Sequence, residues 1–123
     1  MILGMGCDLT SVARIRKAVE QQPFVDKVFT AEEQFEAAQY RDPGDYYAGR
    51  WAAKEAAAKA LGCGFGGRCA PVEIEILHGD AGEPVLRFSG KAAAAIQERG
   101  CSRWHLSLSH DAGMAMAVVI LEA

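Results

Sequence analysis

The segment Gly49–Gly62 concentrates charged side chains among small ones, and it reads GRWAAKEAAAKALG. A helix turns by roughly 100° per residue, so the charged residues would share one half of the cylinder and alanines would fill the other. These charged residues are Arg50, Lys54, Glu55 and Lys59. Carboxylates ligate Mg²⁺, which usually shares its coordination shell with substrate phosphates, and the basic side chains would neutralise the remaining phosphate charge. The simpler alternative is an ordinary Glu55–Lys59 pair on an exposed helix.

A strand predicted at residues 2–9 supplies a second carboxylate. Gly4, Gly6 and Asp8 alternate along one face, and the two glycines would let the alanine face of the helix approach very closely. If these faces meet, Asp8 and Glu55 converge at one rim. Asp8 has an alternative role as the anion at the start of the next helix. The opposite strand face, which we expect in the core, carries Leu3, Met5, Cys7 and Leu9.

The elements that position these residues follow from capping and periodicity. Thr10 and Ser11 can cap a helix that runs to about residue 21 and is ended by Pro23, and a capping box of Thr30 and Glu33 opens a short helix to about residue 40. We expect a long helix at 45–61, a flexible glycine-rich loop at 62–69, strands at 71–77 and 85–88, a helix capped by Ser89 to about residue 99, and a hairpin of 103–110 with 114–121.

This order lacks strict alternation of strands and helices, so it indicates an α+β fold with a largely antiparallel sheet in a single domain of residues 1–123. The last strand is apolar on both faces. In so small a domain, either a helix layer covers each face or a neighbouring subunit covers one. Oligomerisation is therefore a hypothesis.

Composition narrows the class of protein. The 123 residues carry a net charge of −3, which disfavours nonspecific electrostatic binding to nucleic acid. The longest apolar stretch, Met114–Leu121, is far shorter than the roughly 20 residues that a membrane-spanning helix needs. The N-terminal residues read as structure, and no signal peptide is expected. The four cysteines show neither CxxC nor zinc spacing, which favours reduced thiols in a cytoplasmic protein.

Three motifs resemble the holo-acyl-carrier-protein synthases, which are small 4′-phosphopantetheinyl transferases. They are GMGCDL at residues 4–9, RWAAKEAAAKALG at 50–62 and SLSH at 107–110. Further matches are FTAEE at 29–33, VEIEI at 72–76 and GEP at 82–84, and their order and spacing agree over essentially the whole chain. Two departures are Trp51, where the family more often has phenylalanine, and Asp111, which follows His110.

The resemblance implies an α+β homotrimer with active sites at subunit interfaces. It also implies transfer of the phosphopantetheine arm of coenzyme A to a serine of apo-acyl carrier protein in bacterial fatty-acid synthesis. The other product would be adenosine 3′,5′-bisphosphate. Such a transfer depends mainly on positioning and on charge neutralisation around the diphosphate.

The resemblance also assigns roles to particular residues. Asp8 and Glu55 match the Mg²⁺ ligands. The positions near the coenzyme A phosphates are Arg50, Lys54, Lys59 and Gly62, and those that help to hold the nucleotide end are Pro84 and His110. Arg14 matches a contact to the acidic carrier protein. A local basic cluster on its helix, which could steer docking or be a merely solvated face, comprises Arg14, Arg16 and Lys17.

Several roles stay open at this stage. Either Lys54 or Lys59 would assist the leaving phosphate, and the base for the serine proton would be Glu55 or Asp111, directly or through a water. Asp111 could instead cap the hairpin turn, and His110 could be a packed histidine. His78 and His105 are expected to be surface or strand residues. Rival functions are a hydrolase using Ser107 or Ser109, a metal-dependent phosphodiesterase, and a non-catalytic trimeric adaptor.

Overall fold

The helices and strands occur in the predicted order, with one additional helix. The computed structural model describes residues 1–65 and 67–123. Its elements are β1 (Ile2–Ser11), α1 (Val12–Ala18), α2 (Gln22–Val28), α3 (Ala31–Ala37), α4 (Gly44–Ala60), the 3₁₀ turn η1 (Pro71–Glu73), β2 (Ile74–His78), β3 (Pro84–Phe88), α5 (Gly90–Glu98), β4 (Arg103–Asp111) and β5 (Met114–Glu122). The loop predicted at 62–69 is described apart from residue 66.

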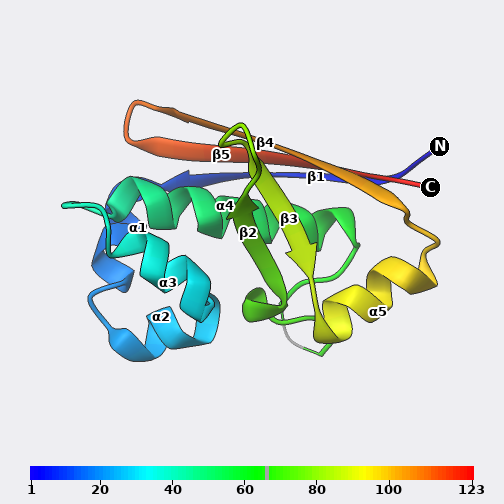
Figure 1. The fold of residues 1–123 in the computed structure, drawn as a ribbon, viewed down its shortest axis with the longest axis horizontal. Helices are drawn as coiled ribbons and strands as arrows, with labels where there is room; N and C mark the ends of the chain where they lie inside the picture. Colours follow the sequence, from blue (N-terminus) through cyan, green and yellow to red (C-terminus); the bar gives the residue numbers. More distant parts are fainter. Residues whose placement is uncertain (66) are drawn as a thin grey trace.

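The strands form two antiparallel sheets, which confirms the α+β class but divides the single sheet that the sequence suggested. The larger sheet has the order β1-β5-β4, so β1 and β4 are its two edges. The smaller sheet is the β2–β3 hairpin. Figure 1 shows α4 running beneath the larger sheet, with α1–α3 gathered near one end of the molecule and α5 near the other. Within the described residues, no helix has the length and hydropathy to traverse a membrane.

The contact between β1 and α4 is as close as the glycine and alanine pattern predicts. A Cβ atom built on Gly4 would overlap the carbonyl oxygen of Ala60, and one built on Gly6 would overlap that of Ala56. Only strand residues without side chains permit the helix backbone to approach so far. This contact sets α4 against the edge strand that carries Asp8.

The prediction that the odd-numbered residues of β1 form a core face is wrong for Met5, Cys7 and Leu9, whereas Leu3 is partly buried and packs against the core. Met5 and Leu9 are 64% and 63% exposed, and Cys7 is exposed as well. Because the glycine face of the strand takes the helix, alternation turns the opposite face outward. Met116 of β5, which pairs with Leu9, is also 43% exposed. We call the surface formed by Met5, Cys7, Leu9 and Met116 the outer sheet face.

The N-terminal helices differ from the prediction at one point. Pro23 does not end a long helix: α1 already ends at Ala18, and Pro23 lies in the first turn of α2. This position suits proline, because the first turn of a helix needs no N–H donor there. The Ser11 cap is confirmed, since its Oγ accepts a hydrogen bond from the Arg14 amide. The Thr30 capping box is also present, whereas Ser89 makes no side-chain capping bond.

Candidate functional site

One cluster forms where β1 meets the C-terminal half of α4. Lys59 Nζ lies 3.3 Å from Asp8 Oδ1 and donates to the Cys7 carbonyl oxygen at 3.0 Å. Thr10 Oγ1 donates to Asp8 Oδ2 at 2.5 Å. The Asp8 side chain is only 15% exposed, whereas that of Lys59 is 54% exposed. The Asp8 carboxylate is thus held in place, and the Lys59 ammonium beside it remains open to a ligand.

Glu55 belongs to the same cluster. Partial burial raises the pKa of its carboxyl group, and the negative charge of Asp8 raises the pKa further. Lys59 and Arg14 act in the opposite direction. Asp8 and Glu55, from separate elements, therefore lie within electrostatic range of each other and repel.

This pair of carboxylates fits a magnesium ion that shares its shell with a substrate. A divalent cation would relieve their repulsion. Within residues 1–65 and 67–123, no group of three or more Asp, Glu, His or Cys side chains is placed to hold a metal. An ion held by Asp8 and Glu55 would therefore need further ligands from water or phosphate oxygens, which is the coordination that Mg²⁺ favours.

Arg50 lies on another side of α4, in mostly buried surroundings. Its side chain is 8% exposed and its guanidinium stacks over the Tyr46 ring, 4.3 Å from the centroid. Its NH2 group lies 3.2 Å from His78 Nε2 and 3.7 Å from Glu36 Oε1. Its Nε is buried without a hydrogen-bond partner among the described residues. His78 is at the surface as expected, but no motif or spacing indicated its contact with Arg50.

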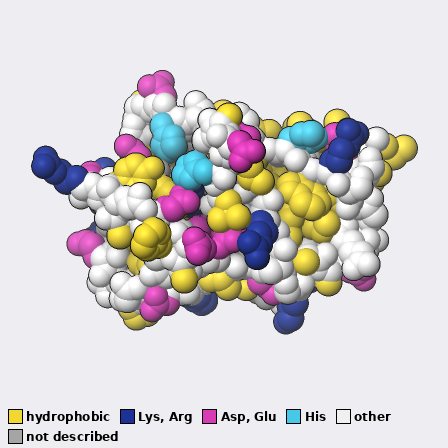
Figure 2. All heavy atoms as spheres, viewed as in Figure 1, with side chains coloured by type: hydrophobic (Ala, Val, Ile, Leu, Met, Phe, Trp, Pro, Cys, Tyr) yellow, Lys and Arg dark blue, Asp and Glu magenta, His cyan; other side chains and the backbone are white. Residues whose placement is uncertain are grey.

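A cavity of about 310 Å³ adjoins this guanidinium. Its lining comprises Tyr40, Asp42, Asp45, Tyr46, Arg50 and His110. His110 Nε2 lies 3.1 Å from the Asp45 carbonyl oxygen, and the ring rests against Gly49, where a Cβ atom would stand 3.1 Å from Cε1. Figure 2 shows two histidine side chains close together, with carboxylate side chains beside them, on the face of the molecule that it draws. The structure thus brings Arg50 and His110 to one cavity.

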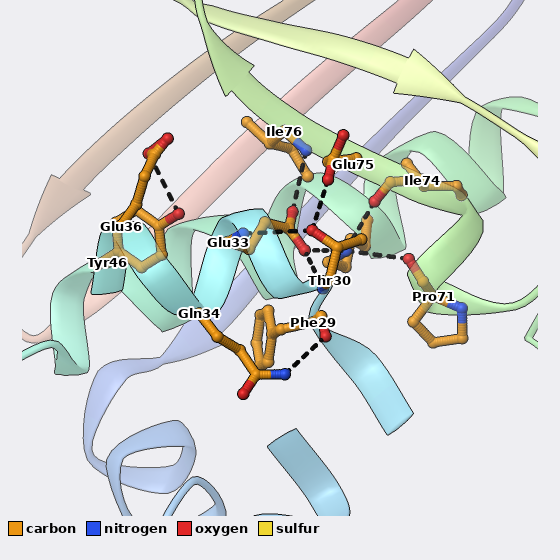
Figure 3. Close-up of polar contacts among 11 residues, drawn as sticks. Phe29, Thr30, Glu33, Gln34, Glu36, Tyr46, Pro71, Ile74, Glu75 and Ile76 are labelled. Atoms are coloured by element: carbon orange, nitrogen blue, oxygen red, sulfur yellow. Dashed lines mark hydrogen bonds and ion pairs between the residues drawn. The ribbon is translucent and has the colours of Figure 1, made fainter. Parts of the chain in front are cut away.

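Lys54, which is predicted to lie near the coenzyme A phosphates, has a fully buried ammonium and is not free to contact a phosphate in this structure. It donates to Glu33 Oε1 at 2.8 Å and to the carbonyl oxygens of Pro71 and Ile74 at 2.9 and 2.7 Å. An ammonium has three N–H donors, and all are used. Burial lowers the pKa of Lys54, while Glu33 opposes this effect. Figure 3 shows Glu33 between Thr30, Ile76 and the backbone of Pro71 and Ile74.

The remaining predicted residues are dispersed. Gly62 ends α4 with φ +74°, and Pro84 begins β3 opposite His78. Asp111 pairs with Met114 at the far end of β4. Side chains alternate between the two faces of a sheet, and Asp111 lies on the same face as Leu9 and Met116. Asp8 points to the other face, so Asp111 cannot reach the Asp8 cluster of its own chain.

The basic residues of α1 are not equivalent. Arg16 is paired with Asp42 at 3.1 Å, with both side chains substantially exposed. Arg14 is in the first turn of α1, which the Ser11 side chain caps. It lies near enough to Glu55 to lower the pKa of the Glu55 carboxyl group. This links the basic cluster of α1 spatially to the Asp8 cluster. His105 forms a surface pair with Glu122 at 2.6 Å, as expected for a strand residue.

The two groups of predicted residues lie on opposite edges of the larger sheet. Asp8 is on the β1 edge, with Glu55 and Lys59 near it, whereas His110 is on the β4 edge, with Arg50 near it. We call these the carboxylate half and the arginine half of the site. The β5 strand separates them within one chain.

Comparison with known proteins identifies the class. The family model of the 4′-phosphopantetheinyl transferase superfamily matches residues 4–119. Holo-[acyl-carrier-protein] synthase from Desulfovibrio desulfuricans is 42% identical, covering 100% of this chain and 99% of the relative. The Salinispora arenicola enzyme of the same name is 43% identical, covering 99% of each.

Solved structures agree with these relatives. The holo-[acyl-carrier-protein] synthase of Neisseria meningitidis superposes with a TM-score of 0.91 at 36% identity, covering 100% of both chains. That of Bacillus anthracis, in complex with CoA (3′,5′-ADP), superposes with a TM-score of 0.85 at 34% identity, covering 100% of this chain and 98% of the other. The chain therefore belongs to the 4′-phosphopantetheinyl transferase superfamily, as an enzyme of the holo-acyl-carrier-protein synthase type.

Proposed function

We propose that this enzyme transfers 4′-phosphopantetheine from coenzyme A to a serine of apo-acyl carrier protein, releasing adenosine 3′,5′-bisphosphate in a Mg²⁺-dependent reaction. The observation that carries this proposal is the junction of β1 and α4, where two carboxylates and an accessible lysine meet. The coenzyme A complexes of the relatives from Bacillus anthracis and Helicobacter pylori support the choice of donor substrate.

The chain's own residues would act on the diphosphate as follows. Asp8 and Glu55 would hold Mg²⁺, and Lys59 Nζ, half exposed beside Asp8, would neutralise charge on the leaving phosphate. When bound, the ion would withdraw charge from the diphosphate oxygens. Lys54 is not available for this task, because its ammonium is buried and saturated.

The serine hydroxyl must lose a proton as it attacks. Glu55 suits this role because its carboxylate lies near Asp8 and Lys59, at the junction where the diphosphate would be held. Asp111 remains a candidate only for the site of a neighbouring chain, because it is on the opposite sheet face from Asp8 in its own chain.

The arginine half would hold the nucleotide end of coenzyme A. The cavity beside Arg50 and His110 supplies a guanidinium, an imidazole and an aromatic ring. Pro84 pairs with His78, which contacts Arg50, so it belongs to the same region. Gly62 lies at the other end of α4, on the side of the carboxylate half.

We infer that a complete site needs two copies of the chain, and that the copies form a homotrimer. The carboxylate half and the arginine half are on opposite edges of one sheet, so the edge of one copy would meet the other edge of its neighbour. Such a head-to-tail contact closes into a ring if the rotation is suitable. The outer sheet face, which is apolar and open, would then be covered inside the ring.

The acceptor would dock on α1. Arg14 and Lys17 present positive charge there, and Arg14 lies near Glu55, so the carrier serine would be delivered to the carboxylate half. Arg16 is tied to Asp42 and would contribute less. Acidic carrier proteins would be attracted to such a local patch even though the whole chain is acidic. The reaction would belong to fatty-acid synthesis in the cytoplasm.

A direct assay tests this proposal. Apo-carrier protein is incubated with the enzyme, coenzyme A and Mg²⁺, and the carrier is then weighed by mass spectrometry. We expect a gain equal to one phosphopantetheine, abolished by a chelator and restored by excess Mg²⁺. Coenzyme A consumption without carrier would instead indicate a phosphodiesterase, and absence of any consumption would support the non-catalytic adaptor.

A further inference from the structure

Two cysteines face each other in the segment that follows α4. Cys63 Sγ and Cys69 Sγ are 3.1 Å apart, and a disulfide bond needs about 2.0 Å, so a movement of roughly one ångström would join them. Five residues separate the two cysteines in sequence. Both are free thiols in the structure, as are Cys7 and Cys101.

The backbone holds both cysteines in place. The Cys63 amide donates to the Ala58 carbonyl oxygen at 3.0 Å, at the C-terminus of α4. On the other side, the amide of Ala70, next to Cys69, donates to Glu73 Oε1 at 2.8 Å. The proximity of the sulfurs therefore follows from anchored chain ends on both sides.

Phe65, which lies between the two cysteines in sequence, forms part of a cavity wall. Phe65 packs against Trp51 of α4, with ring centroids 6.3 Å apart. Trp51, Phe65 and Ala70 line a cavity of about 370 Å³. Trp51 is one helical turn before Glu55 on α4, so this wall lies along the same helix as the carboxylate half.

We propose that Cys63 and Cys69 are a redox-active pair that forms an intramolecular disulfide by exchange with a low-molecular-weight disulfide such as oxidised glutathione. The Cys63 thiolate attacks one sulfur of the small disulfide, whose S–S bond breaks and releases one thiolate. The Cys69 thiolate then attacks the Cys63 sulfur and expels the second thiolate. The two cysteine protons end on the two released thiols, so the protein is oxidised by two electrons and the small disulfide is reduced by two.

The order of attack follows from exposure. Cys63 is partly exposed and can meet a small disulfide, whereas Cys69 is fully buried. Burial, together with the contact to Cys63, raises the pKa of Cys69 to about 12. Cys69 is therefore a poor first nucleophile, but it is placed to resolve a mixed disulfide at 3.1 Å. The bond would fix the segment that carries Phe65 against α4.

Equilibration of the full chain in glutathione buffers tests this proposal. Samples are quenched in acid, alkylated and weighed. With oxidised glutathione in excess, we expect loss of two alkylatable thiols and of the mass of two hydrogen atoms, both reversed by dithiothreitol. Trypsin cleaves after Arg68, so the oxidised chain should yield peptide 60–68 linked to peptide 69–87.

Variants separate this pair from the other cysteines. The double variant Cys7→Ser/Cys101→Ser should form the Cys63–Cys69 disulfide to the same extent as wild type. Cys69→Ser should trap one glutathione on Cys63, and Cys63→Ser should form no internal disulfide. Only glutathione adducts in wild type, or a linked peptide that contains Cys7 or Cys101, would overturn the proposal. Peptide mapping of wild type decides the matter even if a Cys69 variant fails to fold.

A second measurement tests whether the bond fixes the loop. Amide hydrogen exchange is compared between reduced and oxidised wild type for peptides that cover residues 60–71. We expect exchange to slow severalfold in the oxidised form, because the disulfide removes open conformations of this segment. Equal exchange rates in the two forms would contradict the proposal that the disulfide holds the segment carrying Phe65 against α4.

Discussion

At the scale of single residues, burial separates the two lysines that the motif of α4 makes look alike. Lys59 is half exposed beside Asp8, whereas Lys54 is fully buried on Glu33 and two carbonyl oxygens. The first is available to a substrate and the second stabilises the fold. Partial burial also sets Glu55 apart: together with the nearby charge of Asp8, it raises the pKa of the Glu55 carboxyl group.

Replacing Glu55 tests its proposed role directly. In Glu55→Gln, the carboxylate that would bind Mg²⁺ and accept the serine proton is lost, while the size of the side chain is retained. We expect the rate of carrier modification to fall about 100-fold or more, with an unchanged circular dichroism spectrum. Glu98→Gln, at the end of α5, is a matched control and should keep wild-type turnover. A folded Glu55→Gln enzyme with near-normal turnover would refute the role.

The coupling of Asp8 and Glu55 predicts a measurable titration. The raised pKa means that Glu55 takes up a proton at higher pH than an ordinary glutamate. Asp8→Asn removes one cause of this elevation, so the pKa of Glu55 should fall in the metal-free variant. Carbon NMR of the glutamate carboxyl groups can follow it. An unaltered Glu55 titration would show that the two carboxylates do not interact.

At the scale of elements, α4 is held in register by contacts on several sides. Its alanines meet the glycines of β1, and Lys54 ties it to α3 and to the residues around β2. Glu33 completes this junction by accepting from the amides of Thr30 and Ile76, each at 2.9 Å. These contacts fix where Glu55 and Lys59 stand relative to Asp8.

The buried pair predicts a large stability difference between the two lysines. Lys54→Met leaves the Glu33 charge buried without its cation, so the free energy of unfolding should fall by about 3–5 kcal/mol. Lys59→Met, at a half-exposed site, should cost about 1 kcal/mol or less. Urea unfolding of both variants measures this difference. Similar midpoints for the two would contradict the assignment of Lys54 as a structural residue.

The glycine contact of β1 predicts sensitivity to one methyl group. In Gly6→Ala, the added Cβ would overlap the Ala56 carbonyl oxygen, so strand and helix must separate. We expect a loss of about 1–3 kcal/mol in unfolding free energy. Gly64→Ala is the control, since its Cβ would meet no atom within 4 Å. If both substitutions are tolerated equally in thermal denaturation, the close packing of β1 on α4 is not needed.

At the scale of the whole molecule, the open outer sheet face and the separation of the two half-sites lead to the same inference. Met5 and Leu9 of the outer sheet face are each more than 60% exposed, which favours an interaction surface there. If one coenzyme A molecule is held by both halves, as we propose, the carboxylate half and the arginine half must come from different copies of the chain. A ring of copies would meet both requirements.

Assembly can be tested on this surface. Leu9→Asp places a charge on the outer sheet face. By light scattering we expect a trimer for wild type and a monomer for this variant, with loss of carrier modification. Phe35→Asp, at a side chain of α3 that is 68% exposed, should leave the mass unchanged. A wild-type monomer at micromolar concentration would contradict the proposed ring.

Much of the fold could be predicted from local patterns. The capping box of Thr30, the length of α4, the final hairpin and the match of glycines to alanines depend on residues close in sequence or on simple periodicity, and all are present. The missed helix α2 and the shortened α1 have a local cause as well, because Pro23 can start a helix as readily as it can end one.

The sequence by itself determined most of the elements, the residues capable of chemistry and the family, because periodicity and motif spacing are properties of the chain alone. Only the tertiary structure decided that Lys54 is buried, that Met5 and Leu9 face outward, and that Asp8 and His110 occupy opposite sheet edges. The physical reason is that periodicity orients side chains within one element. What covers each face depends on contacts between residues far apart in sequence.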